Sequence, residues 1–230
     1  VYSEERLTEL KRLAAGVAEQ GGQLDAAARL YADTKSWDSL SQLICGVSEQ
    51  LLAQGRNQTL RGYLELLPAA EVENRPWLLY WSGISRVVFD PIGARKDLEQ
   101  AYQQFDAAQQ DIDGLLLSCG GIIQSYFCCG DGMAPTIGWG DRIQQLLQRH
   151  KGWPRPEIQA RVFSNLQGLM FACPHHSLFV EQEAGLDQFL HSLNDPIARL
   201  GVALTFMNVF GWRGESLRLG QMLDNLAVWT

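Results

Sequence analysis

The stretch that decides the fold covers residues 90–108 and reads DPIGARKDLEQAYQQFDAA. Its small and apolar residues recur at steps of three and four, the period of an amphipathic helix; they are Ala94, Leu98, Ala101, Phe105 and Ala108. Asp90 precedes Pro91, so its carboxylate can cap a helix whose first residue needs no N–H donor. The stretch therefore predicts a helix with a defined start and one apolar face.

The same helical period continues on both sides of this stretch. Apolar stripes occur near both ends of the chain, at Leu7, Leu10, Ala14 and Val17, and at Ile197, Leu200, Leu204 and Met207. No stretch combines sustained alternation with a hairpin turn, as a sheet would need. Proline starts at Pro76, Pro156 and Pro196 alternate with glycine stops at Gly21-Gly22, Gly55, Gly130 to Gly132 and Gly211 through Gly214. The chain is therefore predicted to be all-α.

These starts and stops divide the chain into about twelve helices in about six hairpins. The predicted pairs are 3–20 with 23–34, 36–54 with 57–67, 76–89 with 91–109, 111–129 with 135–150, 155–173 with 175–193, and 195–212 with 214–229. The period of roughly 40 residues is typical of helical-hairpin repeats, in which each hairpin buries its apolar face against the next. We expect a single repeat domain over residues 1–230. Because the chain stops at Thr230 inside an apolar helical pattern, we interpret it as part of a longer protein.

A short motif with an aromatic residue recurs where each predicted first helix ends. Its copies carry Phe89, Phe127, Phe171 and finally Phe210 with Trp212. An aromatic residue at this place can wedge against the next hairpin, which supports the repeat interpretation. Gly83, Gly120 and Gly168 lie inside first helices, where glycine costs up to about 1 kcal/mol relative to alanine. Close approach of two helices is the expected reason.

Composition limits the classes of function. The formal net charge is −7 and the pI about 5.1, and no basic stripe is present, so direct nucleic-acid binding is not expected. The strictly apolar runs, such as 77–81, are far shorter than the roughly 20 residues of a membrane span. Five cysteines without a C-x-x-C pair favour reduced thiols and a cytoplasmic location.

Two stretches carry a family resemblance. Residues 25–31 read DAAARLY after a short turn and resemble a tetratricopeptide hairpin, in which small alanines let two helices approach. Residues 63–68 (YLELLP) and 74–81 (NRPWLLYW) resemble the tetratricopeptide-like region of large bacterial transcriptional regulators of the MalT-like, signal-transduction ATPase class. The later stretch from Phe89 to Ala101 is similar to the same group, including members with a bacterial transcriptional activator domain.

The resemblance covers roughly residues 20–229 and rests on packing motifs. It implies a right-handed superhelix, a tetratricopeptide-like α-solenoid, that senses an inducer or a regulatory protein and controls ATP-driven self-association. The ATPase and DNA-binding parts of such regulators would lie outside this chain. Repeats after residue 111 fit the pattern poorly, and 130–140 is a glycine-rich insertion, which puts the later repeats in doubt.

Catalytic motifs are not found, so we expect no enzyme and no cofactor. The sequence has no phosphate-binding G-x-x-x-x-G-K-[ST], no G-x-S-x-G elbow and no H-E-x-x-H. Residues 111–114 (DIDG) lack the closing acidic residue of a calcium loop and are interpreted as a helix start. Cys128-Cys129 and Cys173-Pro174-His175-His176 end two first helices and could ligate zinc. We favour the alternative that Cys119, Cys128 and Cys173 pack as small apolar groups and that the histidines are solvated, with no metal bound.

The candidate binding residues lie on predicted first helices. In tetratricopeptide superhelices these helices line the concave face, so 76–89, 111–129, 155–173 and 195–212 would do so here. Their polar or aromatic residues between packing positions are Tyr80, Arg86, Gln124, Tyr126, Asn165, Gln167 and Asn208. These side chains either bind a polar effector or a peptide backbone, or they bond to neighbouring helices. If the second holds, the aromatic turns at Phe89, Phe127 and Trp212 are the better candidates.

The favoured interpretation is a non-catalytic sensor and protein-interaction module of a bacterial transcriptional regulator. It would bind a small-molecule effector, a peptide or a protein partner, and would control self-association of the full-length protein. The alternatives are a scaffold with protein partners alone and a sensor that uses the Cys/His turns.

We expect the purified chain neither to hydrolyse ATP nor to bind duplex DNA at physiological salt. The reasons are the missing phosphate loop and the acidic charge balance. A phosphate-release assay and a fluorescence-anisotropy titration with a labelled duplex test both expectations. Turnover that persists with the protein through successive purification steps would contradict the first.

Overall fold

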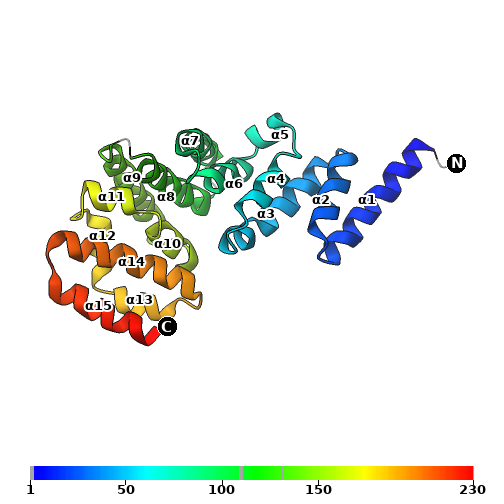
Figure 1. The fold of residues 1–230 in the computed structure, drawn as a ribbon. Coiled ribbons are helices and arrows are strands. Elements are labelled where there is room, and N and C mark those ends of the chain that lie inside the picture. The colour runs from blue at the N-terminus through cyan, green and yellow to red at the C-terminus, as the bar shows by residue number, and fades with distance from the viewer. Residues whose placement is uncertain (1–2, 109–110, 131, 230) are drawn as a thin grey trace. The chain divides into compact units, whose positions relative to one another are not determined.

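The computed structural model describes residues 3–108, 111–130 and 132–229, with the backbone alone for 226–229. These residues form helices joined by turns and contain no strand (Figure 1), which confirms the all-α prediction. Contacts within the chain form two compact units, residues 1–86 (unit 1) and 87–230 (unit 2). The single repeat domain expected over residues 1–230 stays a prediction.

Unit 1 consists of two hairpins followed by two further helices. Its helices are α1 (Glu4–Gln20), α2 (Leu24–Asp33), α3 (Trp37–Ala53), α4 (Asn57–Leu64), α5 (Ala69–Glu73) and α6 (Pro76–Arg86). The predicted helix 57–67 ends at Leu64, the short α5 after Pro68 was not predicted, and the predicted helix 76–89 ends at Arg86. Residues 87–89 form a turn before Pro91, in line with the bias of residues preceding proline away from helical conformation.

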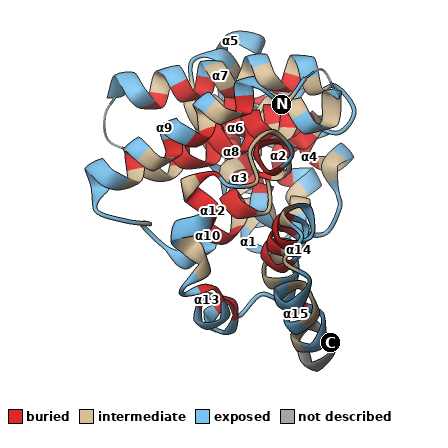
Figure 2. Cartoon of the chain, turned by 90° about the vertical axis from the view of Figure 1, so that its left-hand side faces the viewer, coloured by how far each residue is buried: buried red, intermediate tan, exposed pale blue. Residues whose placement is uncertain are grey.

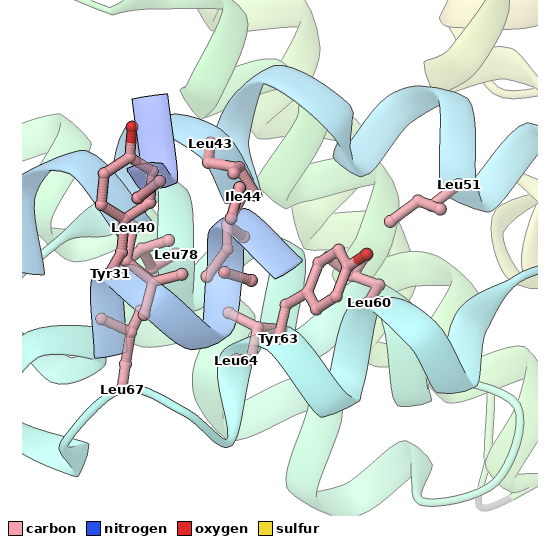
Figure 3. Close-up of a cluster of buried hydrophobic side chains, with 13 residues drawn as sticks. Tyr31, Leu40, Leu43, Ile44, Leu51, Leu60, Tyr63, Leu64, Leu67 and Leu78 are labelled. Carbon is pink, nitrogen blue, oxygen red and sulfur yellow. The ribbon is translucent and has the colours of Figure 1, made fainter. Parts of the chain in front are cut away.

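The core of unit 1 consists mainly of leucines, together with two tyrosines (Figure 3) and small alanines. Ala27 and Ala28 on α2 are fully buried, as the tetratricopeptide-like pattern predicts. The Tyr31 hydroxyl donates to Glu19 Oε2 at 2.7 Å, and the Tyr63 hydroxyl donates to Asp25 Oδ1 at 2.6 Å. Each ring is buried while its polar end reaches a carboxylate, so the tyrosines link α1 with α2 and α2 with α4.

The apolar stripe of the first helix is not buried in unit 1. Leu7, Ala14 and Val17 are exposed and Leu10 is half-buried, whereas Ala15 is the buried residue of α1. Alanine at this position lets α1 lie close to α2, and the larger side chains then point away from the contact. The period predicted the helix correctly, but the face that packs had to be corrected.

Unit 2 consists of nine helices in its described residues. They are α7 (Pro91–Ala108), α8 (Ile112–Cys129), α9 (Pro135–His150), α10 (Pro156–Phe163), α11 (Gln167–Ala172), α12 (Ser177–Glu183), α13 (Leu186–Ser192), α14 (Pro196–Arg213) and α15 (Ser216–Trp229). α8 is the central helix, since it contacts α7, α9, α10 and α11, and it is largely buried (Figure 2). By length and composition α8 could cross a membrane, but a buried core helix meets the same criteria, so this is weak evidence for a span.

The predicted helix ends of unit 2 are built as expected. Asp90, Asp111 and Asp195 each accept a backbone N–H at the start of a helix, from Gly93, Gly114 and Ile197. Gly130 and Gly214 end α8 and α14 with φ of 68° and 73°, a conformation that glycine adopts without strain. The interpretation of 111–114 as a helix start is thus confirmed. Two predicted boundary residues, Gln109 and Asp131, lie outside the described residues.

Two predicted long helices are each divided in two. The predicted helix 155–173 is interrupted at residues 164–166, where Asn165 N and Leu166 N bond to carbonyls three residues back. Ser164 Oγ also donates to the Ala160 carbonyl at 2.8 Å, so a side chain competes with the helical ladder. The predicted helix 175–193 is interrupted at Ala184 and Gly185. The periodicity continues through both interruptions, which is why the sequence did not reveal them.

Glycines let the backbones of unit 2 approach closely. A Cβ on Gly168 of α11 would lie 2.8 Å from the Ile123 carbonyl oxygen of α8, closer than real Cβ contacts allow. A Cβ on Gly120 would lie 3.5 Å from Val162 Cα of α10, which is ordinary contact but against backbone. The expected reason is therefore confirmed for Gly168, which brings α11 against α8, whereas a Cβ would fit at Gly120.

Gly168→Ala should destabilise the protein by about 1–3 kcal/mol, because α11 must move away from the α8 backbone. The control is Gly138→Ala in α9, where a Cβ would meet nothing within 4 Å. That substitution should leave stability unchanged or raise it by up to about 1 kcal/mol, since alanine favours the helix. Urea unfolding of the two variants measures the difference, and equal stabilities would disprove the close-approach argument.

Candidate functional site

Three exposed aromatic side chains form a continuous row on unit 2. Phe127 at the end of α8 stacks on Phe171 of α11, with ring centroids 5.7 Å apart and an interplanar angle of 8°. Phe171 meets Trp212 of α14 edge to face at 5.3 Å. The exposed fractions are 37% for Phe127, 44% for Phe171 and 63% for Trp212. We call these residues the aromatic row; they are three of the recurring turn aromatics, and their rings join α8, α11 and α14.

The aromatic row continues into an exposed apolar face of α14. The inner side of this helix packs through Val202, Phe206, Val209 and Phe210, which are buried. The stripe of Ile197, Leu200, Leu204 and Met207 lies on a different side; its first three residues are exposed and Met207 is half-buried. α14 therefore carries two apolar faces, and the sequence stripe is the outer one.

A shallow hollow lies where the outer face of α14 meets α15. It encloses about 350 Å³ and is lined by Met207, Asn208, Gly211 and Trp212 of α14 and by Leu219 of α15. Asn208 is exposed and is one of the predicted binding residues. The hollow is thus lined both by Asn208, a predicted binding residue, and by Trp212 of the aromatic row.

Three amide side chains precede the row by one helical turn. Gln124 precedes Phe127, Gln167 precedes Phe171, and Asn208 precedes Trp212. The Oε1 atoms of both glutamines are buried and accept no hydrogen bond within the described part of the chain. Their Nε2 atoms are engaged, with Cys128 Sγ at 3.6 Å for Gln124 and with the Ser164 carbonyl at 2.6 Å for Gln167. Buried carbonyl oxygens without a donor are uncommon in folded proteins.

The other predicted residues have different surroundings. The ring of Tyr126 lies 3.4 Å from the Arg95 guanidinium carbon, so this side chain bonds α8 to α7. Asn165 lies in the break between α10 and α11, close to Gly120. Tyr80 is fully buried among Trp77 and Trp81 in unit 1, where it packs, and Arg86 is the half-buried last residue of α6. Gln124, Gln167 and Asn208 thus accompany the aromatic row, while Tyr80 and Arg86 belong to the other unit.

A buried ion-pair cluster fixes the end of α14. The Arg213 side chain is only 4% exposed; its Nε donates to the Pro174 carbonyl at 2.8 Å and it pairs with Glu183 of α12. Arg218 of α15 pairs with Glu183 and with Glu215. Burial by itself would raise the pKa of Glu183, but the hydrogen bonds and charges of Arg218 and Arg213 outweigh it and lower the pKa. This cluster holds α12, α14 and α15 together beside Trp212.

The Cys/His turns do not form a recognisable metal site. Among the described residues, no group of three or more His, Cys, Asp or Glu side chains could hold a metal ion. His176 instead accepts the Leu178 N–H through Nδ1 at 3.2 Å, which caps α12, and its Nε2 lies 3.3 Å from Asp141 Oδ1. Cys119 is fully buried, and burial raises its pKa, so this thiol packs as an apolar group.

Sequence reasoning found the apolar stripe of α14 but did not predict that this stripe is exposed while a second apolar face packs. It also missed the Arg213 cluster. A signal for the second face was present, because apolar residues between 197 and 212 cover more than one side of the helix. Such a helix needs a second contact surface. Nothing in the sequence indicated that Arg213 would meet Glu183, which lies 30 residues earlier.

Comparison with known proteins does not assign the chain to a family. No protein-family model matches the chain, and no match was found among curated proteins or solved structures.

Glu183→Gln should destabilise the protein at neutral pH by about 2 kcal/mol, because buried Arg213 loses its closer carboxylate and keeps only Glu215 at 3.4 Å. Since the pKa of Glu183 is lowered in the folded state, this contribution is present above the pKa of the unfolded chain. It is lost as the pH falls through the lowered pKa. Urea unfolding between pH 7 and pH 3 measures the difference between variant and wild type.

Glu181→Gln is the matched control, because Glu181 lies on the same helix and is exposed. It should cost less than about 1 kcal/mol. Equal effects of the two substitutions, or an effect of Glu183→Gln that grows at low pH, would refute the role assigned to Glu183.

Proposed function

We propose that the chain is a non-catalytic protein-interaction module that binds an amphipathic helix of a partner protein on unit 2. The binding surface would be the aromatic row together with the outer face of α14. In this proposal the hairpins belong to a tetratricopeptide-like solenoid, and the resemblance to MalT-like regulators supports a role as the sensor part of a bacterial transcriptional regulator. The observation that carries the proposal is the second apolar face of α14.

The chemistry of this surface favours an apolar partner face. Its members on α14 are Ile197, Leu200, Leu204, Met207, Asn208, Gly211 and Trp212, and none is charged. Contiguous exposed apolar residues of this kind mark interaction sites in soluble proteins. Exposed aromatic residues such as Trp212 and Phe171 are frequent energetic centres of interfaces.

The shape favours a helix as the occupant. α14 has 18 residues and is therefore about 27 Å long, enough to accompany five turns of a second helix. A partner helix with apolar residues at i, i+3, i+4 and i+7 could lay that stripe along α14 and insert one side chain into the hollow beside Trp212.

The resemblance supports a regulatory role. In the family that the chain resembles, this region receives a signal and controls self-association. Occupation of the α14 face by a partner helix would be one way to transmit such a signal in the cytoplasm, and a second copy of the chain could compete for the same face. A pure scaffold would use the surface in the same way but would not change the association of the full-length protein.

The double substitution Phe171→Asp with Trp212→Asp should abolish partner-helix binding. The probe is a displayed library of 18-residue helical peptides, selected on the wild-type chain. Selected peptides should share an apolar stripe with helical spacing, bind at micromolar concentration, and lose at least tenfold in affinity, about 1.4 kcal/mol or more, for the double variant. Anisotropy titrations with the labelled peptides measure the change.

Trp212→Phe is the control, because phenylalanine keeps an aromatic contact with Phe171. It should change affinity by no more than about threefold. Thermal unfolding should show all variants folded, since the substituted side chains are exposed. Selected peptides that bind wild type and double variant equally would show that the surface is not the binding site.

A further inference from the structure

A second hollow lies between α7 and α9, on residues that the proposed partner surface does not use. It encloses about 330 Å³, and its lining includes Glu99, Tyr102 and Asp106 of α7 and Trp139 and Arg142 of α9. This volume is at the lower end of the range of small-molecule sites, which is about 300–1,000 Å³. The hollow therefore suits a small ligand.

The two rings of the hollow already hold a cation. Tyr102 and Trp139 meet edge to face with centroids 5.3 Å apart. The guanidinium carbon of Arg142 lies 5.4 Å from the Tyr102 centroid and 5.6 Å from the Trp139 centroid, within the range of cation–π attraction. Arg142 also donates to the Tyr102 hydroxyl at 3.4 Å, a long hydrogen bond. Arg142 is exposed and on a flexible side chain, so a free cation can take its place.

Two carboxylates flank the rings along α7. Glu99 and Asp106 are seven residues apart on one face of the helix, a rise of about 10.5 Å, and Tyr102 lies between them. Glu99 is half-buried and makes no hydrogen bond or ion pair with the described residues. Asp106 is exposed and interacts electrostatically with Arg142. The hollow thus offers an acidic group at each end and an aromatic middle.

We propose that this hollow binds an aliphatic diamine or polyamine. One ammonium group would pair with Glu99 and the other with Asp106, while the methylene chain lies against Tyr102 and Trp139 and Arg142 moves aside. A monoamine could use only one carboxylate, and a compact divalent metal ion could not use the rings. The site is independent of the partner surface, so either proposal can fail without the other.

The direct test is calorimetric titration of the whole chain with 1,4-diaminobutane and with spermidine. We expect one site with a dissociation constant below about 1 mM. 1-Aminobutane and Mg²⁺ should bind at least tenfold more weakly. Equal binding of Mg²⁺ and the diamine, or no heat from either amine, would overturn the proposal.

Substitutions in the hollow should change the amine affinity in opposite directions, a result that loss of folding cannot produce. Glu99→Gln and Trp139→Leu should each weaken binding several-fold, whereas Arg142→Gln should strengthen it at least threefold, because it removes the competing cation. Arg29→Gln is the matched control: it makes the same change of charge at an exposed position of α2 that does not line this hollow. If Arg142→Gln and Arg29→Gln change the affinity equally, the amine responds to net charge alone and the site is disproved.

Discussion

The structure of unit 2 depends on the approach of α11 to the backbone of α8. At Gly168 the two helices lie so close that a single added carbon would meet the Ile123 carbonyl oxygen at 2.8 Å. This contact also sets the register of the next turn of each helix, because Phe127 lies one turn after Ile123 and Phe171 lies one turn after Gly168. The two rings can stack nearly parallel only because the backbones meet one turn earlier. The aromatic row is thus a consequence of a glycine contact.

α14 extends this arrangement. Its inner face packs through Phe206 and Val209, and Arg213 anchors its end to Glu183 and the Pro174 carbonyl. A helix held on one side in this way presents its other side at a fixed angle. Trp212, next to the anchored arginine, therefore reaches Phe171 while Leu204 remains exposed. A rigid apolar surface loses little conformational entropy when it binds, which favours its use as an interface.

The two proposed sites differ in chemistry and lie on different helices of unit 2. The partner surface is uncharged and lies on α8, α11 and α14, whereas the α7–α9 hollow combines carboxylates with aromatic rings. α8 contacts both α7 and α11 and so lies between the two sites. α9, which lines the hollow, also contacts α11, so coupling between the two sites could pass through α8 or through α9.

The sequence by itself determined the helices and most of their ends. Period, proline starts and caps such as Asp90, Asp111 and Asp195 act between residues a few positions apart, so they can be read along the chain. It also predicted the recurring aromatics and the close approach at Gly168. Only the tertiary structure decided which apolar face packs. Leu7 and Leu204 have the same spacing as core residues, but Ala15 and Phe206 occupy the contacts. The breaks at residues 164–166 and at Gly185, the burial of Tyr80 and the pairing of Arg213 with Glu183 were likewise decided by contacts between distant segments. Helical periodicity shows which residues are apolar and share a face, but it does not show which of them contact another helix.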